Sequence, residues 1–152
     1  MIEASAGTGK TFLLVQLYLR LLVEKDLTPA RILTVTFTRA ATAELRRRVR
    51  GRIRAALAAL GGDGGDPGAA ELTAFWTGRG GLSAASVRQR LERALRGLDQ
   101  AAIFTIHSFC QRALGRYPFE AGAEFEVEPI EDDSAPLRRI AQDFWVRELS
   151  GA

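Results

Sequence analysis

The apolar residues of this 152-residue chain recur in two patterns, one with the spacing of helices and one as short β-branched runs. Apolar positions three and four apart mark helices, whereas Ile, Val, Thr and Phe in close succession are typical of buried strands. The patterns predict helices over 12–25, 40–60, 83–98, 107–117 and 137–149, and buried strands over 31–37 and 101–106. The last helix has Trp145 on its apolar side. Strands that alternate with helices favour an α/β fold with a parallel sheet.

Polar residues mark the expected helix starts, and apolar residues mark the faces that the helices bury. Thr38 and Ser83 are placed as N-caps. The second helix carries the apolar stripe Ala41, Leu45, Val49, Ile53 and Leu57, and the third carries Val87, Leu91, Ala94, Leu95 and Leu98. The first helix is apolar on most faces, so it is expected to be largely buried. The run GGDGGDPG at 61–68 is expected to be a flexible loop, and residues 71–82 indicate no single element.

A glycine-rich run stands directly before the first helix and matches a phosphate-binding loop. The run is Ala4-Ser5-Ala6-Gly7-Thr8-Gly9-Lys10-Thr11, and Met1–Glu3 before it is interpreted as the stub of a strand. Glycines let backbone N–H groups face the phosphates, and the helix that follows adds a positive partial charge. Lys10 is placed at the β- and γ-phosphates and the Thr11 hydroxyl at Mg²⁺, whereas Ala4 replaces the first glycine of the pattern. The sequence therefore predicts that residues 4–11 bind a nucleoside triphosphate.

Polar and aromatic residues follow both predicted strands at the points where helices begin. They are Thr36, Phe37, Thr38 and Arg39 after the first strand, and Thr105, His107, Ser108 and Phe109 after the second. α/β proteins bind ligands at this edge of the sheet. A serine hydroxyl can donate to a phosphate, and a phenylalanine ring can stack on a base. The alternative for His107 is a structural hydrogen bond at the helix start, and Cys110 is interpreted as a packing residue rather than a nucleophile.

The net charge of +3 conceals a basic and an acidic part. Residues 1–118 hold 18 Lys/Arg against 9 Asp/Glu, whereas residues 119–152 hold 3 Arg against 9 acids. Seven arginines and one acid lie between Arg39 and Arg54, which leaves two interpretations open, a solvated helix face or contact with a polyanion. The six acids between Glu124 and Asp133 are interpreted as solvated surface rather than a metal site. One cysteine forms no internal disulfide and fits a reducing cytoplasm, and no apolar run of about 20 residues predicts a membrane span.

Taken in order, the three segments resemble motifs I, Ia and Ib of superfamily 1 DNA helicases of the UvrD/Rep type. That family's loop commonly reads A-x-A-G-T/S-G-K-T, which accounts for Ala4, and its next motifs resemble TFTxxAAxEL and TxHxF. More narrowly, these segments and the later FEAGAEFEVEPIEDD and DFWVREL resemble the exodeoxyribonuclease V beta subunits, the RecB-type members. The similarity covers nearly the whole chain except about 61–82. Arg39 departs from the pattern, because relatives tend to carry Glu or Asn there.

The resemblance implies a P-loop NTPase fold, a RecA-like parallel sheet with flanking helices, here incomplete. Residues 1–118 would be the first half of motor domain 1A, and residues 119–152 the start of the inserted helical subdomain 1B. Residues 4–11 would bind ATP and Mg²⁺, with Lys10 and Thr11 as catalytic residues and Thr11 as the metal ligand. Single-stranded DNA would contact Thr36, Phe37, Thr38, Arg39, Thr105, His107, Ser108 and Phe109. The partners implied are DNA ends and RecC-like and RecD-like subunits, in double-strand break repair and recombination.

Several parts of such an enzyme have no counterpart in the sequence. ATP hydrolysis needs an apolar strand ending in Asp-Glu, and the candidate Ile130–Asp133 follows Pro129 instead. An arginine finger, a second motor domain and a nuclease site are also missing. The chain is therefore expected to be an N-terminal fragment that is inactive alone and is marginally stable or exposes apolar sheet surface. The alternatives are a small P-loop kinase and a non-enzymatic arginine-rich module that binds nucleic acid.

Overall fold

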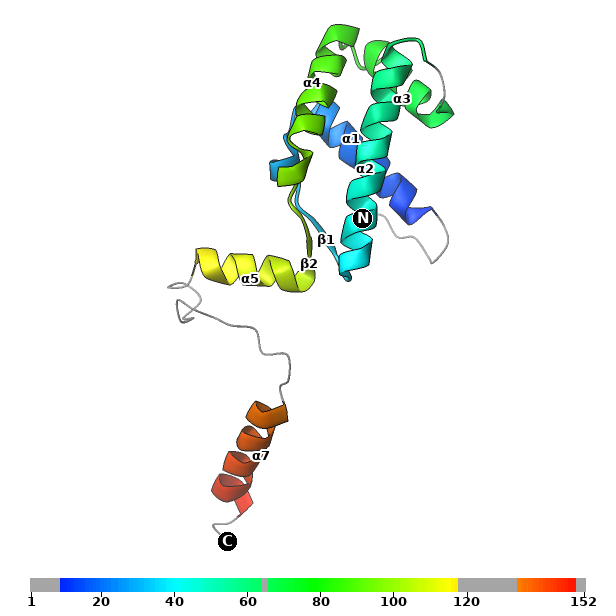
Figure 1. Ribbon diagram of the computed structural model, residues 1–152. Coiled ribbons are helices and arrows are strands. Elements are labelled where there is room, and N and C mark those ends of the chain that lie inside the picture. Colours follow the sequence, from blue (N-terminus) through cyan, green and yellow to red (C-terminus); the bar gives the residue numbers. More distant parts are fainter. Residues whose placement is uncertain (1–8, 64–65, 118–133, 150–152) are drawn as a thin grey trace. The chain divides into compact units, whose positions relative to one another are not determined.

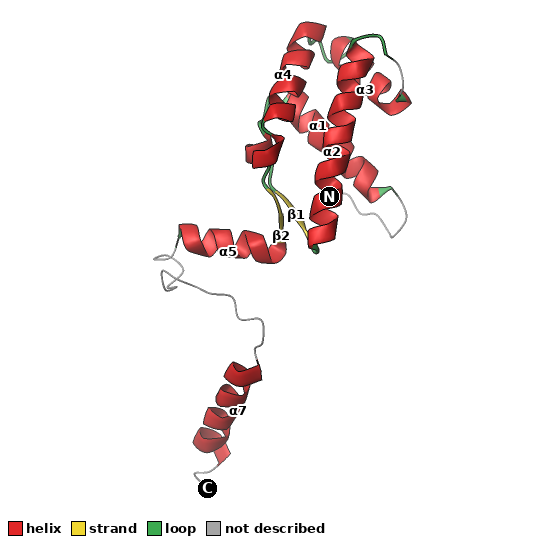
Figure 2. Ribbon diagram, viewed as in Figure 1, coloured by secondary structure: helices red, strands yellow, loops and turns green. Residues whose placement is uncertain are grey.

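The computed structural model describes residues 9–63, 66–117 and 134–149, and it divides after Gln111 into two compact units. Helices predominate, and the strands are short (Figures 1 and 2). The described elements are α1 (Lys10–Glu24), η1 (Pro29–Arg31), β1 (Thr34–Thr36), α2 (Arg39–Leu60), α3 (Pro67–Thr77), α4 (Ala84–Arg96), η2 (Leu98–Gln100), β2 (Ile103–Thr105), α5 (Ile106–Arg116) and α7 (Ser134–Leu149). The predicted strand stub at Met1–Glu3 lies outside the described residues.

The strands β1 and β2 pair in parallel, and the chain crosses between them through α2, α3 and α4. Thr34 lies opposite Ile103, and Thr36 lies opposite Thr105. The predicted α/β class with a parallel sheet is confirmed, although each strand is only three residues long. Because parallel strands in register end at the same edge, the segments after β1 and β2 lie next to each other.

Side chains cap the helices where the sequence predicts it. The Thr38 hydroxyl accepts a hydrogen bond from the N–H of Ala41 at 3.0 Å, and the Ser83 hydroxyl accepts one from Ser86 at 3.1 Å. The loop predicted over 61–68 is partly wrong, because Asp66 caps α3 and Pro67 opens it. Aspartate and proline favour a helix start as much as a turn, so the composition of this run alone does not decide between them.

Helix α2 lies at the centre of the first unit, where it contacts α1, α3, α4 and both strands (Figure 1). The largest fully buried side chains are Trp76, Leu19, Leu22, Ile53, Leu91, Leu98, Ile103, Val23, Val49 and Val87. Burial of each such aliphatic side chain contributes about 1.5–3 kcal/mol to folding. The predicted apolar faces of the helices at 40–60 and 83–98 are confirmed at Leu45, Val49, Ile53, Val87 and Leu91.

Trp76 gives the ambiguous stretch 71–82 a defined role. Its ring is fully buried in the core, and its Nε1–H donates to Glu24 Oε1 at 3.2 Å. A buried indole is stabilised when its N–H has such a partner. Helix α3 is therefore anchored on α1 by one aromatic residue.

The predicted burial is wrong at β1 and in the first half of α1. The side chains of Leu33, Val35 and Phe37 are 52%, 41% and 80% exposed. Four apolar residues of α1, at positions 12, 13, 14 and 17, are also at least 40% exposed. The apolar pattern says that a segment can be buried, but it does not supply the elements that cover it. The expected exposure of apolar sheet surface is thereby confirmed for β1.

The described part of the second unit contains α7, which begins three residues before the predicted helix. Its apolar side chains at positions 137, 140, 144, 145 and 146 are more than half exposed. The predicted domain boundary after Pro118 and the acidic run at 124–133 lie outside the described residues. No helix among the described residues is long and apolar enough to cross a membrane.

Candidate functional site

The end of the predicted phosphate loop forms the start of α1. Gly9 adopts the left-handed backbone conformation, with φ 74° and ψ 16°, which favours glycine because it lacks a Cβ. The first helical hydrogen bond runs from the N–H of Leu13 to the carbonyl of Gly9 at 3.0 Å. Lys10 and Thr11 follow in the first turn, and both are exposed. Residues 4–8 of the predicted loop lie outside the described residues.

The N-terminus of α1 suits an anion. Among the described residues no side chain caps it, and its first turn contains no acidic residue. The first turns of α2, α3 and α4, by contrast, each donate a backbone N–H hydrogen bond to a capping side chain. Uncapped N–H groups at a helix start attract phosphate through hydrogen bonds and the helix dipole. Lys10 and Thr11 lie in this turn, so their ammonium and hydroxyl groups are the ones that could hold a phosphate and Mg²⁺ here.

Hydroxyl groups shape the turn that follows β1. Thr36 Oγ1 and Thr42 Oγ1 share a hydrogen bond at 2.6 Å, and each also lies 3.1 Å from the carbonyl oxygen of Thr38. Thr38 itself caps α2. These three threonines are therefore occupied in fixing the loop, and the neighbouring Phe37 is left open, with 80% of its side chain exposed.

The turn after β2 is built in a similar way. Thr105 Oγ1 accepts the N–H of Ser108 at 3.2 Å and donates to Ser108 Oγ at 2.9 Å. Phe109 is 37% exposed, and His107 is exposed without a hydrogen bond to any described residue. The structural alternative for His107, a hydrogen bond at the helix start, is thus not observed in the described part of the chain.

Cys110 does not pack as predicted. It is a free, exposed thiol on α5, a helix that buries none of its side chains. The interpretation of Cys110 as a packing residue is therefore wrong within the described part of the chain.

A cleft of about 420 Å³ separates the start of α2 from the end of β2. It is lined by Arg39, Thr42, Ala43, Arg46, Ile103, Phe104, Thr105 and Ser108. The lining residues outside the predicted site are Thr42, Ala43, Arg46, Ile103 and Phe104. Thr42 follows Thr38 by four positions and Arg46 follows Thr42 by four, which places them on one face of α2, and this signal was present in the sequence.

Arg46 ties α2 to the strand β2. Its Nη2 donates to the carbonyl of Ile103 at 2.9 Å and to that of Ala101 at 3.4 Å. The N–H of Thr34 bonds to the carbonyl of Ala102, so the carbonyls bound by Arg46 point to the other edge of β2. Arg46 Nε is buried without a hydrogen bond to a described residue. Arg46 therefore covers the outer edge of β2 and leaves one donor unused beside the cleft.

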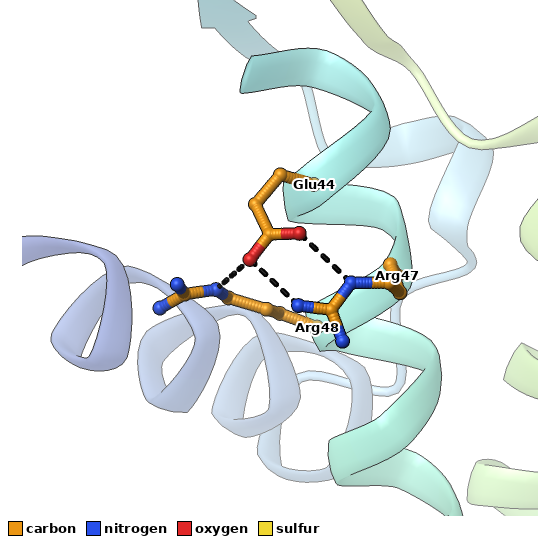
Figure 3. Close-up of polar contacts among 3 residues, drawn as sticks. All are labelled: Glu44, Arg47 and Arg48. Carbon is orange, nitrogen blue, oxygen red and sulfur yellow. Dashed lines mark hydrogen bonds and ion pairs between the residues drawn. The ribbon is translucent and has the colours of Figure 1, made fainter. Parts of the chain in front are cut away.

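Glu44 forms ion pairs with two arginines of α2 (Figure 3). One carboxylate oxygen accepts from Arg48 Nε at 2.6 Å and from Arg47 Nη2 at 2.7 Å, and the other accepts from Arg47 Nε at 2.8 Å. The hydrogen bonds from Arg47 and then Arg48 lower the pKa of Glu44 to about 2. The carboxylate therefore stays ionised throughout the neutral range, and it pairs with two of the arginines of this helix.

Further along α2, Arg50 pairs with Asp99 at 2.7 Å and Arg52 pairs with Asp66 at 2.6 Å. Among the arginines of this helix, Arg39 and Arg54 have no partner in the described part of the chain. The interpretation of the whole helix as a free basic face is thus not supported. Arg39 at the rim of the cleft is the arginine best placed for an external anion.

Comparisons with known proteins agree with the motifs. The UvrD/REP helicase N-terminal domain family model matches residues 1–149. The RecBCD enzyme subunit RecB of Escherichia coli K12 is 44% identical over 156 residues, which cover 97% of this chain. The subunit of the same name from Mycobacterium tuberculosis H37Rv is 46% identical over 143 residues and 94% of the chain, and that from Haemophilus influenzae is 41% identical over 95%.

The chain spans 13% of the length of each of these relatives. The family match covers both segments that line the cleft and the start of α1. The chain therefore belongs to the UvrD/REP helicase N-terminal domain family.

Proposed function

We propose that the chain is the nucleotide-binding and DNA-contacting start of an ATP-dependent DNA helicase and exonuclease subunit of the RecB type. The observation that carries this proposal is the register of the sheet, in which Thr36 lies opposite Thr105. This pairing brings the two predicted DNA-contacting segments to one edge and one cleft. Family membership supports the P-loop NTPase class with a RecA-like sheet.

Residues 4–11 form the ATP site in this proposal. Gly9 gives the loop its left-handed turn, and the first turn of α1, which no described side chain caps, offers N–H donors to the phosphates. Lys10 offsets the phosphate charge, and Thr11 holds Mg²⁺. ATP, when bound, supplies the free energy for movement along DNA, whereas this chain's residues bind and orient it. Because no strand ending in Asp-Glu is evident in the sequence, the chain alone binds ATP without hydrolysing it.

Single-stranded DNA follows the edge where β1 and β2 end. The exposed rings of Phe37 and Phe109 stack on bases, and Arg39 contacts a phosphate. Ser108 and His107 contribute hydrogen bonds from the start of α5. The threonine hydroxyls at positions 36, 38 and 105 act indirectly, since they fix the turns that present these residues.

The larger assembly is part of the same proposal. Residues 1–118 begin motor domain 1A, and residues 119–152 begin the inserted subdomain 1B. The parent protein acts at DNA ends in double-strand break repair and recombination, with RecC-like and RecD-like subunits. The name of the relatives, RecBCD enzyme subunit RecB, supports the RecC-like and RecD-like partners.

The two alternatives are less well supported. If the chain were a small P-loop kinase, the paired segments after β1 and β2 would have no function. A module that binds nucleic acid through its arginine-rich helix requires free arginines, yet five of the seven between Arg39 and Arg54 are engaged within the protein.

Titration of single-stranded DNA as a function of salt tests the DNA-binding part. Arg39→Gln removes one phosphate contact, so we expect affinity to fall roughly fivefold and the slope of log K against log salt to fall by about 0.7. The matched control is Arg54→Gln, which removes an exposed arginine of the same helix away from the cleft. Equal losses in both variants would favour the arginine-rich module and contradict the proposed DNA path.

A further inference from the structure

One arginine joins the starts of two helices to the middle of a third. The side chain of Arg52 is only 11% exposed, and its Nη1 lies 2.6 Å from Asp66 Oδ1. Its guanidinium carbon also lies 5.0 Å from the centre of the Phe12 ring. Arg52 belongs to α2, Phe12 to the first turn of α1, and Asp66 caps α3.

The surroundings of Arg52 hold its guanidinium in place. The Asp66 oxygen that binds Arg52 also accepts the N–H of Ala69 at 3.0 Å, which fixes the carboxylate. A Cβ at Gly68 would lie 3.2 Å from Arg52 Nη1, so glycine leaves the room that the guanidinium needs. The cation therefore has a fixed partner on one side and the Phe12 ring on the other.

Phe12 transmits this contact to the phosphate loop. It follows Lys10 and Thr11 directly, and it precedes Leu13, whose N–H makes the first hydrogen bond of α1. The Phe12 ring is 52% exposed, so close packing accounts for little of its placement. A cation over an aromatic face attracts the ring and resists its rotation.

We propose that Arg52 is a positioning residue for the ATP site. Through Phe12 it fixes the first turn of α1, and with it Lys10 and Thr11, relative to the core helix α2. Asp66 binds the same guanidinium, so that the start of α3 and the first turn of α1 both contact Arg52. This inference rests on the proposed function of residues 4–11 as an ATP site.

Four variants of the 152-residue chain test the proposal. Arg52→Ala removes the cation, whereas Arg52→Lys keeps the charge and loses the planar group that stacks on the ring. Phe12→Leu removes the ring, and Asp66→Asn keeps an N-cap acceptor while removing the charge. Arg54→Ala is the control, since it removes an exposed arginine of the same helix that has no described partner.

The first measurement is hydrogen exchange at the amides of Leu13 and Leu14 without nucleotide. We expect Arg52→Ala and Phe12→Leu to speed this exchange roughly tenfold, Arg52→Lys to speed it less, and Arg54→Ala to leave it unchanged. The double variant Arg52→Lys/Phe12→Leu should be no faster than the faster single variant, because both break one contact. Unchanged exchange in Arg52→Lys and Phe12→Leu, or additive effects, would overturn the proposal.

The second measurement is the affinity for Mg²⁺-ATP, with the unfolding midpoint recorded for each variant. A positioning role predicts a roughly three- to tenfold loss of ATP affinity in Phe12→Leu and Arg52→Ala, with partial recovery in Arg52→Lys. A purely structural role would lower the midpoint and leave ATP affinity unchanged, which would overturn the inference. If the unaltered chain did not bind ATP, the proposed function would fail, while hydrogen exchange would still decide whether Arg52 fixes the first turn of α1.

Discussion

At the scale of single residues, the side chains near the candidate site fall into two groups. Some form the hydrogen bonds that build the turns, and others are exposed to solvent. Thr36, Thr42 and Thr105 satisfy one another or nearby backbone groups. Phe37 and Arg39 make no such contacts in the described structure and face solvent. A motif position can therefore matter for DNA binding through the shape of a loop as well as through direct contact.

Tyr18 offers a residue-scale test of the core. Burial raises the pKa of Tyr18 to about 12, against a smaller lowering by Arg46, and its hydroxyl donates to the carbonyl of Pro29 at 3.4 Å. The unfolded chain loses this proton near its ordinary pKa of about 10. Because the folded-state pKa is higher, the contribution to stability is complete below about pH 10 and is lost as the pH rises toward 12.

We expect Tyr18 to account for about 2–3 kcal/mol of the stability lost between about pH 9 and pH 12. Urea unfolding across this range should show a steeper decline for the unaltered chain than for Tyr18→Phe, which has no phenol to ionise. Parallel declines in the two proteins would show that Tyr18 keeps its ordinary pKa in the folded state.

At the scale of elements, the pairing of α2 with β2 explains how the sheet is bounded. Arg46 reaches the carbonyls of Ala101 and Ile103 on the outer edge of β2. An uncovered strand edge invites pairing with another chain. Arg46 thus protects this edge while it fixes α2 beside the cleft.

Replacement of Arg46 by methionine should lower the free energy of unfolding by about 2 kcal/mol, because two carbonyls lose a charged donor. The freed edge should also raise self-association, measured by sedimentation at increasing protein concentration. Arg54→Met is the matched control on the same helix. A methionine variant that stays monomeric and equally stable would remove this role from Arg46.

Sequence patterns predict where the helices and strands lie better than they predict which side chains contact one another. The caps at Thr38 and Ser83 and the buried faces of α2 and α4 follow from local rules and helical spacing. Helix α3 is harder to foresee, because Asp66 and Pro67 favour a turn and a helix start alike. The contacts of Arg46 and Arg52 depend on residues 14 to 57 positions away, so no local pattern could specify them.

At the scale of the whole molecule, the number of unpaired arginines and the amount of exposed apolar surface differ from what composition alone suggests. The ion pairs of Glu44, Asp66 and Asp99 engage arginines that would otherwise form one basic face. The apolar face of β1 and the first half of α1 remain uncovered within the described residues. The core of the first unit instead comes mainly from the four helices α1–α4, which hold the start of α1 and the cleft on one framework.

In the proposed function, residues 4–11 bind ATP through Lys10. Calorimetric titration of Mg²⁺-ATP into the 152-residue chain and into its Lys10→Ala variant is the decisive test of this role. We expect one saturable site in the unaltered chain and an affinity lower by at least about tenfold in the variant, because a cation at the phosphates is lost. Equal binding by both proteins, or no binding by either, would contradict the claim.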